Sequence, residues 1–201
     1  IATLNPEIIV FAPTTDDIYE GQTISQSFNF DGLENQMEGK FRPGHFNGVG
    51  TIVKRLFEIV EPTNAYFGEK DFQQLQIVKK MVAKNKMNVT IVGCPIFREP
   101  NQLAMSSRNA LLTPKEKQEA SIIFKTLIES KEKFQKYNAK IATDYVQKSF
   151  GNNPTFTLEY FQIADEATLL PCLRKNKNKN YRAFIAVFVN NIRLIDTISL
   201  N

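Results

Sequence analysis

Two short runs of this chain combine residue types that bind phosphate groups. The first reads Gly68-Glu69-Lys70-Asp71 and lies between a brief apolar segment and a helical pattern. The N-terminus of a helix presents backbone N–H groups to an anion, and Lys70 adds a mobile positive charge. Gln74 follows four residues later, one turn along the same face. The run therefore predicts an anion site. The alternative is an ordinary helix start with a solvated Lys70, and the GxxxxGKS/T phosphate loop is not matched.

The second run, Met105-Ser106-Ser107-Arg108, places two hydroxyl groups and a guanidinium in a loop. Such a loop can surround phosphate oxygens and close when substrate arrives. The alternative is a hinge between domains whose polar groups satisfy their own backbone. A serine nucleophile is not expected, because there is no G-x-S-x-G elbow and no plausible histidine base. His45, the single histidine, is assigned a structural role near a helix start, with substrate contact as the alternative.

Composition indicates a globular protein of one or two domains. The chain has 201 residues, of which 42% are hydrophobic and 23% charged. No stretch approaches the roughly 18–20 apolar residues of a membrane span, and the opening Ile-Ala-Thr-Leu-Asn-Pro shows no secretory signal. Two distant cysteines, Cys94 and Cys172, fit reduced thiols in the cytosol. With one histidine, no metal site is expected.

The net charge of +4 lies mainly in the second half of the chain. Residues 174–179 alternate lysine with asparagine, a pattern typical of a solvated loop between strands. Nucleic-acid contact is the alternative, but no aromatic residues interleave with the lysines to stack on bases. No nucleic-acid or membrane partner is therefore expected.

The first half of the chain alternates strand and helix patterns. A strand–helix–strand order favours a parallel sheet with crossover helices, and so an α/β fold. We expect a buried strand at residues 8–12, an irregular stretch at 14–44, a helix at 45–60 ended by Pro62, a strand at 65–67, a helix at 72–86 with a stripe of Leu75, Val78, Met81 and Val82, and a strand at 89–92 stopped by Gly93 and Pro95.

After Asn109 the pattern changes to helices followed by strands. Thr113 and Pro114 are typical of a helix start, and we expect that helix to run to about residue 136. We expect a second helix at 139–150, a break at 151–154, and strands at 156–163, 182–189 and 192–200, the last two joined by a tight turn at Asn190-Asn191. Residues 110–201 are thus predicted to form a small α+β domain, separate from residues 1–109.

Several of these runs together closely resemble one family. Residues 67–75 and 103–109, with 42–49, 11–13 and 194–196, resemble pantoate–β-alanine ligases in their order and spacing. The resemblance implies a Rossmann-like nucleotidyl-transferase domain, of which residues 1–109 are the C-terminal part, followed by a small α+β lid domain at residues 110–201. It covers the chain from about Asn5 to its end.

The resemblance also implies an activity. Family members condense pantoate with β-alanine in two steps: ATP and pantoate form an enzyme-bound pantoyl adenylate and pyrophosphate, and the amine of β-alanine then releases pantothenate and AMP. Mg²⁺ accompanies the ATP. The family members are usually cytoplasmic homodimers.

Site residues follow from the matched motifs. Lys70, Ser106 and Arg108 are expected to act on the phosphates as catalytic residues, and Gln74 to hold pantoate. Phe97 occupies the position of a backbone contact with adenine. The full set expected to bind ATP is Gly68, Glu69, Lys70, Asp71, Phe97, Met105, Ser106, Ser107 and Arg108.

The chain departs from the family pattern in two ways. The His-x-Gly-His signature, the first ATP-binding loop and another pantoate-binding glutamine have no counterpart. The chain therefore looks like a fragment starting at Ile1, and we expect it to be inactive alone. The alternative from another class is a non-catalytic binding or oligomerisation module that retains half of the nucleotide site. Secondly, Gln102 stands where the family usually has glycine, which is expected to stiffen the loop before Met105.

Overall fold

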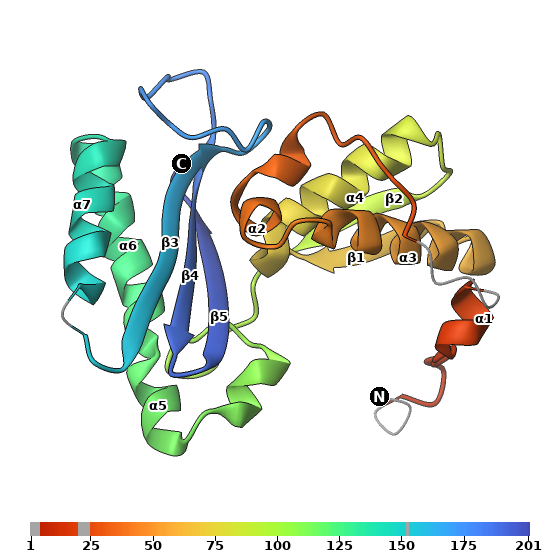
Figure 1. The fold of residues 1–201 in the computed structure, drawn as a ribbon, viewed down its shortest axis with the longest axis horizontal. Coiled ribbons are helices and arrows are strands. Elements are labelled where there is room, and N and C mark those ends of the chain that lie inside the picture. Colours follow the sequence, from red (N-terminus) through yellow and green to blue (C-terminus); the bar gives the residue numbers. More distant parts are fainter. Residues whose placement is uncertain (1–4, 20–24, 152) are drawn as a thin grey trace.

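Two lobes lie side by side in the computed structural model, which describes residues 5–19, 25–151 and 153–201 (Figure 1). The first lobe contains strands β1 (Asn64–Gly68) and β2 (Thr90–Cys94) and helices α2 (Met37–Phe41), α3 (His45–Val60) and α4 (Phe72–Lys84). The second contains strands β3 (Phe156–Asp165), β4 (Tyr181–Val189) and β5 (Ile192–Ser199) and helices α5 (Pro114–Glu119), α6 (Ser121–Lys136) and α7 (Ala139–Phe150). The mixed α/β fold class is confirmed.

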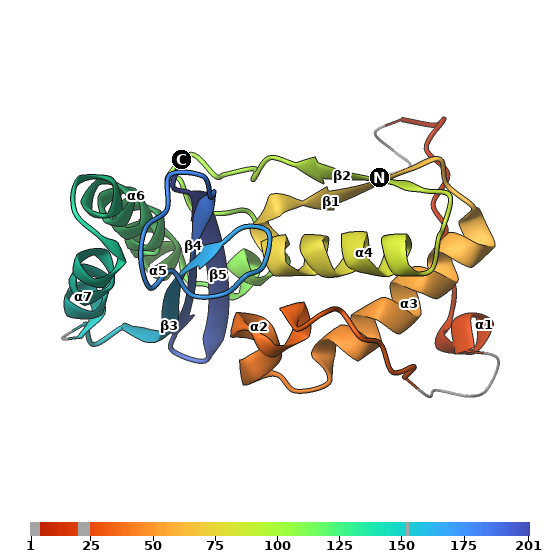
Figure 2. The same ribbon diagram turned by 90° about the horizontal axis from the view of Figure 1, so that it is seen from above.

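A parallel strand pair with a crossover helix forms the first lobe. β1 pairs with β2 in parallel, and α4 lies along one face of the pair (Figure 2). The predicted stripe of α4 is buried throughout, since Leu75, Val78, Met81 and Val82 are each at most 9% exposed. Burial of such a side chain stabilises a fold by about 1.5–3 kcal/mol. The periodicity therefore located both the helix and its packing face.

Strand β2 continues past its predicted end. Gly93 pairs with Phe67 in the ladder instead of stopping the strand. A Cβ atom on Gly93 would lie 3.1 Å from the Leu75 side chain, so the missing side chain lets α4 pack closely on the sheet. The glycine thus marks close approach of a helix rather than a turn.

The expected strand at residues 8–12 is wrong. The segment has no regular structure, and Ile9 is 93% exposed. It has no ladder partner among the described residues, and an apolar run alone does not distinguish a strand from other structure. The stretch 14–44 is also less irregular than expected, since it holds α1 (Thr15–Tyr19), η1 (Leu33–Asn35) and α2. Residues 1–4, with the opening at Ile1, and residues 20–24 lie outside the described part.

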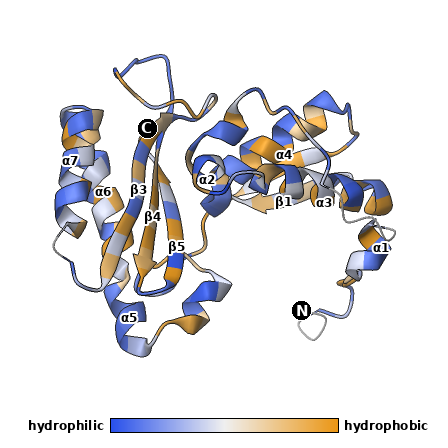
Figure 3. Cartoon of the chain, viewed as in Figure 1, coloured by the Kyte–Doolittle hydropathy of each residue, from blue (hydrophilic) through white to orange (hydrophobic). Residues whose placement is uncertain are grey.

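A three-stranded antiparallel sheet forms the second lobe, in the order β3-β4-β5. The central strand β4 is buried and largely hydrophobic along its length (Figure 3). Asn190 has φ 51° in the turn between β4 and β5, so the predicted hairpin is confirmed. Residues 174–179 form an exposed loop between β3 and β4, as expected.

The helices of the second lobe differ from the prediction in one detail. Thr113 caps α5 with Pro114 in the first turn, as predicted, and Glu116 completes a reciprocal capping box with Thr113. The single helix expected up to residue 136 is instead divided at Ala120, where ψ is −12° and the turn tightens. Helix α7 has its predicted bounds. The break after it is confirmed at Gly151 and Asn153, while Asn152 lies outside the described residues.

Aromatic and ionic contacts join the two lobes. The Phe72 ring of α4 lies 6.0 Å from the Phe184 ring of β4, and the Arg182 guanidinium lies 4.0 Å from the Phe72 ring. Leu103 packs in the core of the second lobe although it precedes Asn109. The lobes therefore share a packed junction. No helix in the described ranges is long and apolar enough to cross a membrane.

Replacing Gln102 with glycine is expected to stabilise the protein by about 0.5–1 kcal/mol. Gln102 has φ 71°, a left-handed conformation that strains a residue with a side chain. Urea denaturation of the Gln102→Gly variant measures the effect. Gln118→Gly, in the exposed part of α5, is the control and should lose about 0.5–1 kcal/mol. A loss at Gln102 as well would contradict the account.

Candidate functional site

A cavity of about 820 Å³ lies at the junction of the lobes. The first lobe lines it with α2, α3, α4 and the β1–α4 connection, and the second lobe lines it with β3, β4 and β5. The segments after β2 and before α5 complete the wall. Nine of the ten residues expected to bind ATP or pantoate line this cavity: Gly68, Lys70, Asp71, Gln74, Phe97, Met105, Ser106, Ser107 and Arg108. Residues from distant parts of the sequence thus meet in one site.

Glu69 is the exception, because its carboxylate turns away from the cavity. Its Oε2 atom lies 3.3 Å from Nη2 of Arg182 on β4. Arg182 also bonds Glu166, with 2.9 Å between Nε and Oε1. The side chain of Glu69 therefore belongs to the junction between the lobes.

Lys70 lies in the short helix η2 (Glu69–Asp71), immediately after β1. Its ammonium is 3.4 Å from Asp71 Oδ2, and its side chain is only 18% exposed. The parallel strand aims this turn at the cavity, since the C-terminal ends of such strands face ligand sites. The first backbone N–H groups of a helix lack intrahelical partners. The turn can therefore offer an anion both backbone donors and a cation.

Residues 105–108 form hydrogen bonds at both ends of the segment, to the segment after β2 and to β5. The Met105 N–H donates to the Phe97 carbonyl over 2.9 Å. Ser106 Oγ accepts from the Arg108 N–H over 3.2 Å, which caps η3 (Ser107–Leu111). The Arg108 guanidinium donates through Nη1 to the Arg193 carbonyl over 3.1 Å. Two exposed apolar side chains, Phe97 and Met105, and a basic group thus border the same space.

A buried amide anchors the far end of that segment. Asn109 is 3% exposed, and its Nδ2 donates to Glu99 Oε1 over 2.7 Å and to the Ala104 carbonyl over 3.1 Å. Lys117 forms an ion pair with the same Glu99. The loop is therefore tied to α5 on one side.

Two adjacent glutamines of α4 have different roles. Gln73 is buried, donates to the carbonyls of Leu33 and Gln36, and accepts from the Glu38 N–H over 3.0 Å. Gln74 faces the cavity and has no side-chain hydrogen-bond partner within the described part of the chain. Gln73 thus fixes the neighbouring backbone, whereas Gln74 keeps its donors and acceptors available for a ligand.

Comparisons with known proteins find relatives along nearly the whole chain. The family model for pantoate–β-alanine ligase matches residues 2–199. A pantothenate synthetase of Flavobacterium psychrophilum is 66% identical over 200 residues, covering 100% of this chain and 71% of that protein. One of Christiangramia forsetii is 51% identical, covering 97% of the chain and 69% of that protein. The chain belongs to the pantoate–β-alanine ligase family.

Solved structures of ligases from this family share the fold. A pantothenate synthetase of Thermus thermophilus superposes with a TM-score of 0.90 at 33% identity, covering 99% of this chain and 73% of that one. A ligase of Francisella tularensis, solved with β,γ-ATP and β-alanine, has a TM-score of 0.62 at 30% identity, and the match covers 92% of this chain and 62% of that one. The family resemblance seen in the sequence is thus confirmed, and pantoate–β-alanine ligation is the activity that these relatives support.

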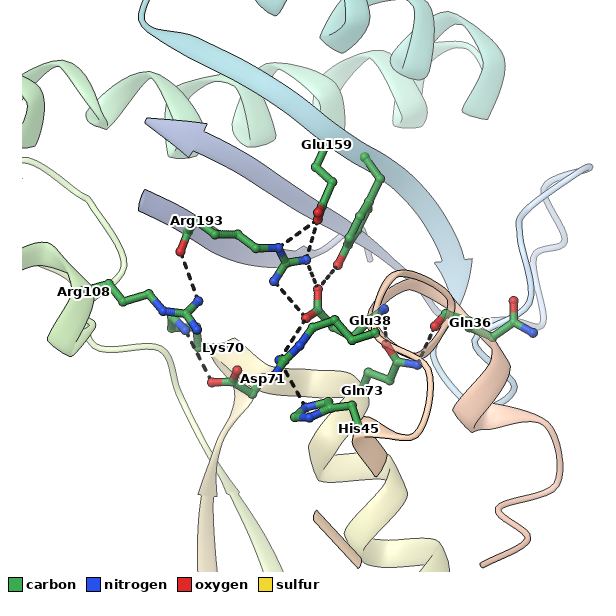
Figure 4. Close-up of polar contacts among 11 residues, drawn as sticks. Gln36, Glu38, His45, Lys70, Asp71, Gln73, Arg108, Glu159 and Arg193 are labelled. Carbon is green, nitrogen blue, oxygen red and sulfur yellow. Dashed lines mark hydrogen bonds and ion pairs between the residues drawn. The ribbon is translucent and has the colours of Figure 1, made fainter. Parts of the chain in front are cut away.

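Sequence reasoning missed one cluster of this candidate site, which joins α2 to β3 and β5 (Figure 4). Glu38 accepts from Arg193 through both carboxylate oxygens, at 2.9 Å and 2.6 Å, and from the Tyr160 hydroxyl at 2.8 Å. Glu159 accepts from Arg193 Nε over 2.9 Å. Arg193 directly precedes the motif at residues 194–196, which was the available signal, but its partners lie far away in the sequence.

Charges in this cluster stabilise one another. Burial opposes ionisation of Glu38, but hydrogen bonds from Arg193 and Tyr160 outweigh it and lower its pKa. Burial and the Glu38 carboxylate raise the pKa of Tyr160, so its hydroxyl stays protonated and donates. Burial likewise opposes the charge of Arg193, and its bonds with Glu38 and Glu159 raise its pKa. All three groups therefore hold their hydrogen-bonding forms near neutral pH.

The single histidine is expected to titrate below pH 6.5. Burial and the neighbouring Arg42 lower the pKa of His45 in the cavity wall. Proton NMR of the imidazole measures this directly, because no other histidine contributes a signal. The unfolded chain takes up the proton more readily, so His45 also makes stability fall as pH drops below 6.5. A titration midpoint above pH 6.5 would contradict the lowered pKa of His45.

A second ionic junction lies beside the cavity. The Arg98 guanidinium donates to both oxygens of Asp196 on β5, at 2.7 Å and 3.0 Å, and lies 3.7 Å from the centre of the Phe124 ring. The Asp196 side chain is 3% exposed. This pair fixes the loop after β2 against β5 and α6.

The described residues hold no group of three or more histidine, cysteine, aspartate or glutamate side chains that could bind a metal ion. Asp71 lines the cavity with a half-exposed carboxylate, whereas Glu38 and Asp196 are occupied by arginines. Mg²⁺ in nucleotide sites is usually held by one or two carboxylates, by phosphates and by water. These residues thus fit a metal that arrives with a nucleotide, and not one bound by the protein alone.

Proposed function

We propose that this chain forms part of a pantoate–β-alanine ligase that activates pantoate as a pantoyl adenylate in the cavity between the lobes. The observation that carries the proposal is the convergence of Lys70, Arg108 and Gln74 on one cavity. Two cationic side chains suit a triphosphate, and a free amide suits a hydroxy acid. The Francisella tularensis relative, solved with β,γ-ATP and β-alanine, supports the same ligands here.

In the first step, a carboxylate oxygen of pantoate attacks the α-phosphorus of ATP, and the bond to the pyrophosphate oxygen breaks. Negative charge develops on the phosphate oxygens and on the leaving pyrophosphate. Lys70 and Arg108 supply positive charge there, and the Ser106 hydroxyl can donate a hydrogen bond. Pre-placed groups of this kind stabilise a transition state because they need not reorganise during the reaction.

In the second step, the amine of β-alanine attacks the acyl carbon of the adenylate. The carbon–oxygen bond to AMP breaks, and the amine nitrogen loses a proton. Gln74 holds the pantoyl group in place while the amine approaches. We assign the adenine ring to the exposed side chains of Phe97 and Met105 and to the backbone at Phe97.

Mg²⁺ belongs to this proposal as the ion that accompanies ATP. When bound, it supplies charge neutralisation at the phosphates. Asp71 is the cavity residue that we assign to it, together with the phosphate oxygens. A cytoplasmic homodimer, as in the family, stays a prediction.

We also propose that residues 1–201 alone turn over negligibly. The His-x-Gly-His run of the family has no counterpart in them, and His45 lies in a different sequence context. A completed chain, in which the Flavobacterium psychrophilum relative supplies the part that this chain does not cover, should be active. Substantial turnover by residues 1–201 alone would contradict this proposal.

Isotope exchange tests the adenylate directly. With ATP, magnesium and labelled pyrophosphate, the completed chain should transfer label from pyrophosphate into ATP. This exchange should require pantoate but should not require β-alanine. Exchange reports a reversible step that precedes amide formation. If pantothenate forms, and pyrophosphate binds to and leaves the enzyme freely, but no label enters ATP, the adenylate mechanism is wrong.

The adjacent glutamines give a matched pair of variants. Gln74→Ala should raise the KM for pantoate by about tenfold or more and leave the melting temperature unchanged, because its amide contacts ligand only. Gln73→Ala should lower stability by about 1–3 kcal/mol, because it leaves buried backbone groups without partners. Steady-state kinetics and thermal melts of both variants separate the roles. The reverse pattern would contradict the assignment.

A further inference from the structure

One series of hydrogen bonds crosses the cavity wall from its pantoate side to its phosphate side. Gln73 accepts from the Glu38 N–H, and the Glu38 carboxylate accepts from Arg193 through two bonds. The Arg193 carbonyl in turn accepts from Arg108 Nη1 over 3.1 Å. Figure 4 shows these residues converging from α2, α4, β5 and η3. Because Gln73 directly precedes Gln74, the series starts beside the group assigned to pantoate.

We propose that Glu38 and Arg193 are positioning residues, which hold the Arg108 guanidinium where the phosphates of ATP bind. The identity of that ligand rests on the proposed function. Arg108 is exposed, and the Arg193 carbonyl is the partner of its guanidinium. An exposed arginine otherwise samples many rotamers, and fixing it on binding opposes affinity. A held guanidinium meets the phosphates already oriented.

The anchor at Arg193 is rigid enough for this role. The side chains of Arg193 and Glu38 are each 13% exposed, and the two-bond geometry fixes the direction of the guanidinium. Glu159 binds the same guanidinium from β3, and the Tyr160 hydroxyl fills another site on Glu38. Surface ion pairs lack this restraint and contribute little. The start of β5, and with it the Arg193 carbonyl, is therefore held against α2.

The competing explanation is a clamp that only holds the lobes together. A clamp would change the stability of the protein, and its loss would affect catalysis to the same degree whether or not Arg108 is present. A positioning role predicts instead that the effect disappears when Arg108 is removed. Non-additivity of this kind distinguishes the two, because residues that act through one another do not contribute independently.

The test is a double-variant cycle in the completed chain. Glu38→Gln keeps the shape of the side chain but removes its charge, and should lower kcat/KM for ATP by about tenfold. The KM for β-alanine should change by less than about twofold. In an Arg108→Ala background, the same substitution should change kcat/KM for ATP by less than about twofold. An equal loss in both backgrounds would overturn the proposal.

Two further variants serve as a control and as a substitute for Glu38→Gln. Glu166→Gln neutralises a carboxylate that also bonds an arginine, Arg182, outside the cavity, and should leave kcat/KM for ATP unchanged. Tyr160→Phe removes one hydrogen bond to Glu38 and should lower kcat/KM for ATP less than Glu38→Gln does. If Glu38→Gln folds poorly, Tyr160→Phe takes its place in the cycle. Calorimetric ATP binding on the same proteins tests the coupling independently of turnover. A completed wild-type chain that binds ATP but makes no pantothenate would refute the proposed function and not this inference.

Discussion

Replacing Lys70 with methionine in the completed chain is expected to lower kcat/KM for ATP by about 100- to 1000-fold. The substitution removes the positive charge of the Lys70 side chain in η2 but keeps an apolar stem of similar length. Because the Lys70 side chain is largely enclosed in the cavity wall, no solvent cation replaces its ammonium in a fixed position. Steady-state kinetics with ATP as the varied substrate measures the loss.

The control is Lys79→Met, on the exposed face of α4 and away from the cavity lining. It should leave kcat/KM unchanged within about twofold, because surface substitutions away from special features have small effects. The melting temperatures of both variants should match that of the wild type. An equal loss in the two variants would mean that Lys70 has no specific place at the phosphates.

Replacing Asp196 with alanine is expected to destabilise the protein by about 3–5 kcal/mol. The substitution leaves the Arg98 guanidinium enclosed between the Phe124 ring and β5 without its two carboxylate contacts. Leaving an enclosed charge without a partner lowers stability far more than losing an ion pair at the surface does. Urea denaturation followed by circular dichroism measures the change.

An exposed ion pair provides the comparison for this variant. Asp144 pairs with Lys140 on α7, and both side chains are more than half exposed. Asp144→Ala should therefore change the free energy of unfolding by less than about 1 kcal/mol. A loss at Asp196 no larger than the loss at Asp144 would show that the buried pair does not hold the junction.

Local patterns were sufficient to predict most of the secondary structure. The stripe of α4, the helix start at Thr113 and the Asn190 turn depend on residues close together in sequence, so they can be predicted without tertiary information. The segment at residues 8–12 shows the limit, because an apolar run becomes a strand only beside a partner. The division between α5 and α6 at Ala120 is a change in one ψ angle that no residue type there indicates.

The candidate site divides in the same way. Lys70, Gln74 and residues 105–108 lie in compact motifs, and the structure brings them to one cavity. The cluster around Glu38 could not be predicted, since Glu38 and Arg193 are 155 residues apart and meet only when the lobes pack. Glu69 shows the converse, because a residue inside a recognised motif turns to Arg182 at the junction.

AMP release from ATP and magnesium by the completed chain decides whether this cavity carries out pantoate–β-alanine ligation. Release is expected to require both pantoate and β-alanine, to accompany an equal amount of pantothenate, and to be negligible with residues 1–201 alone. AMP release that ignores either substrate, or no release by a folded completed chain that binds ATP, would contradict the assignment of this cavity to pantoate–β-alanine ligation.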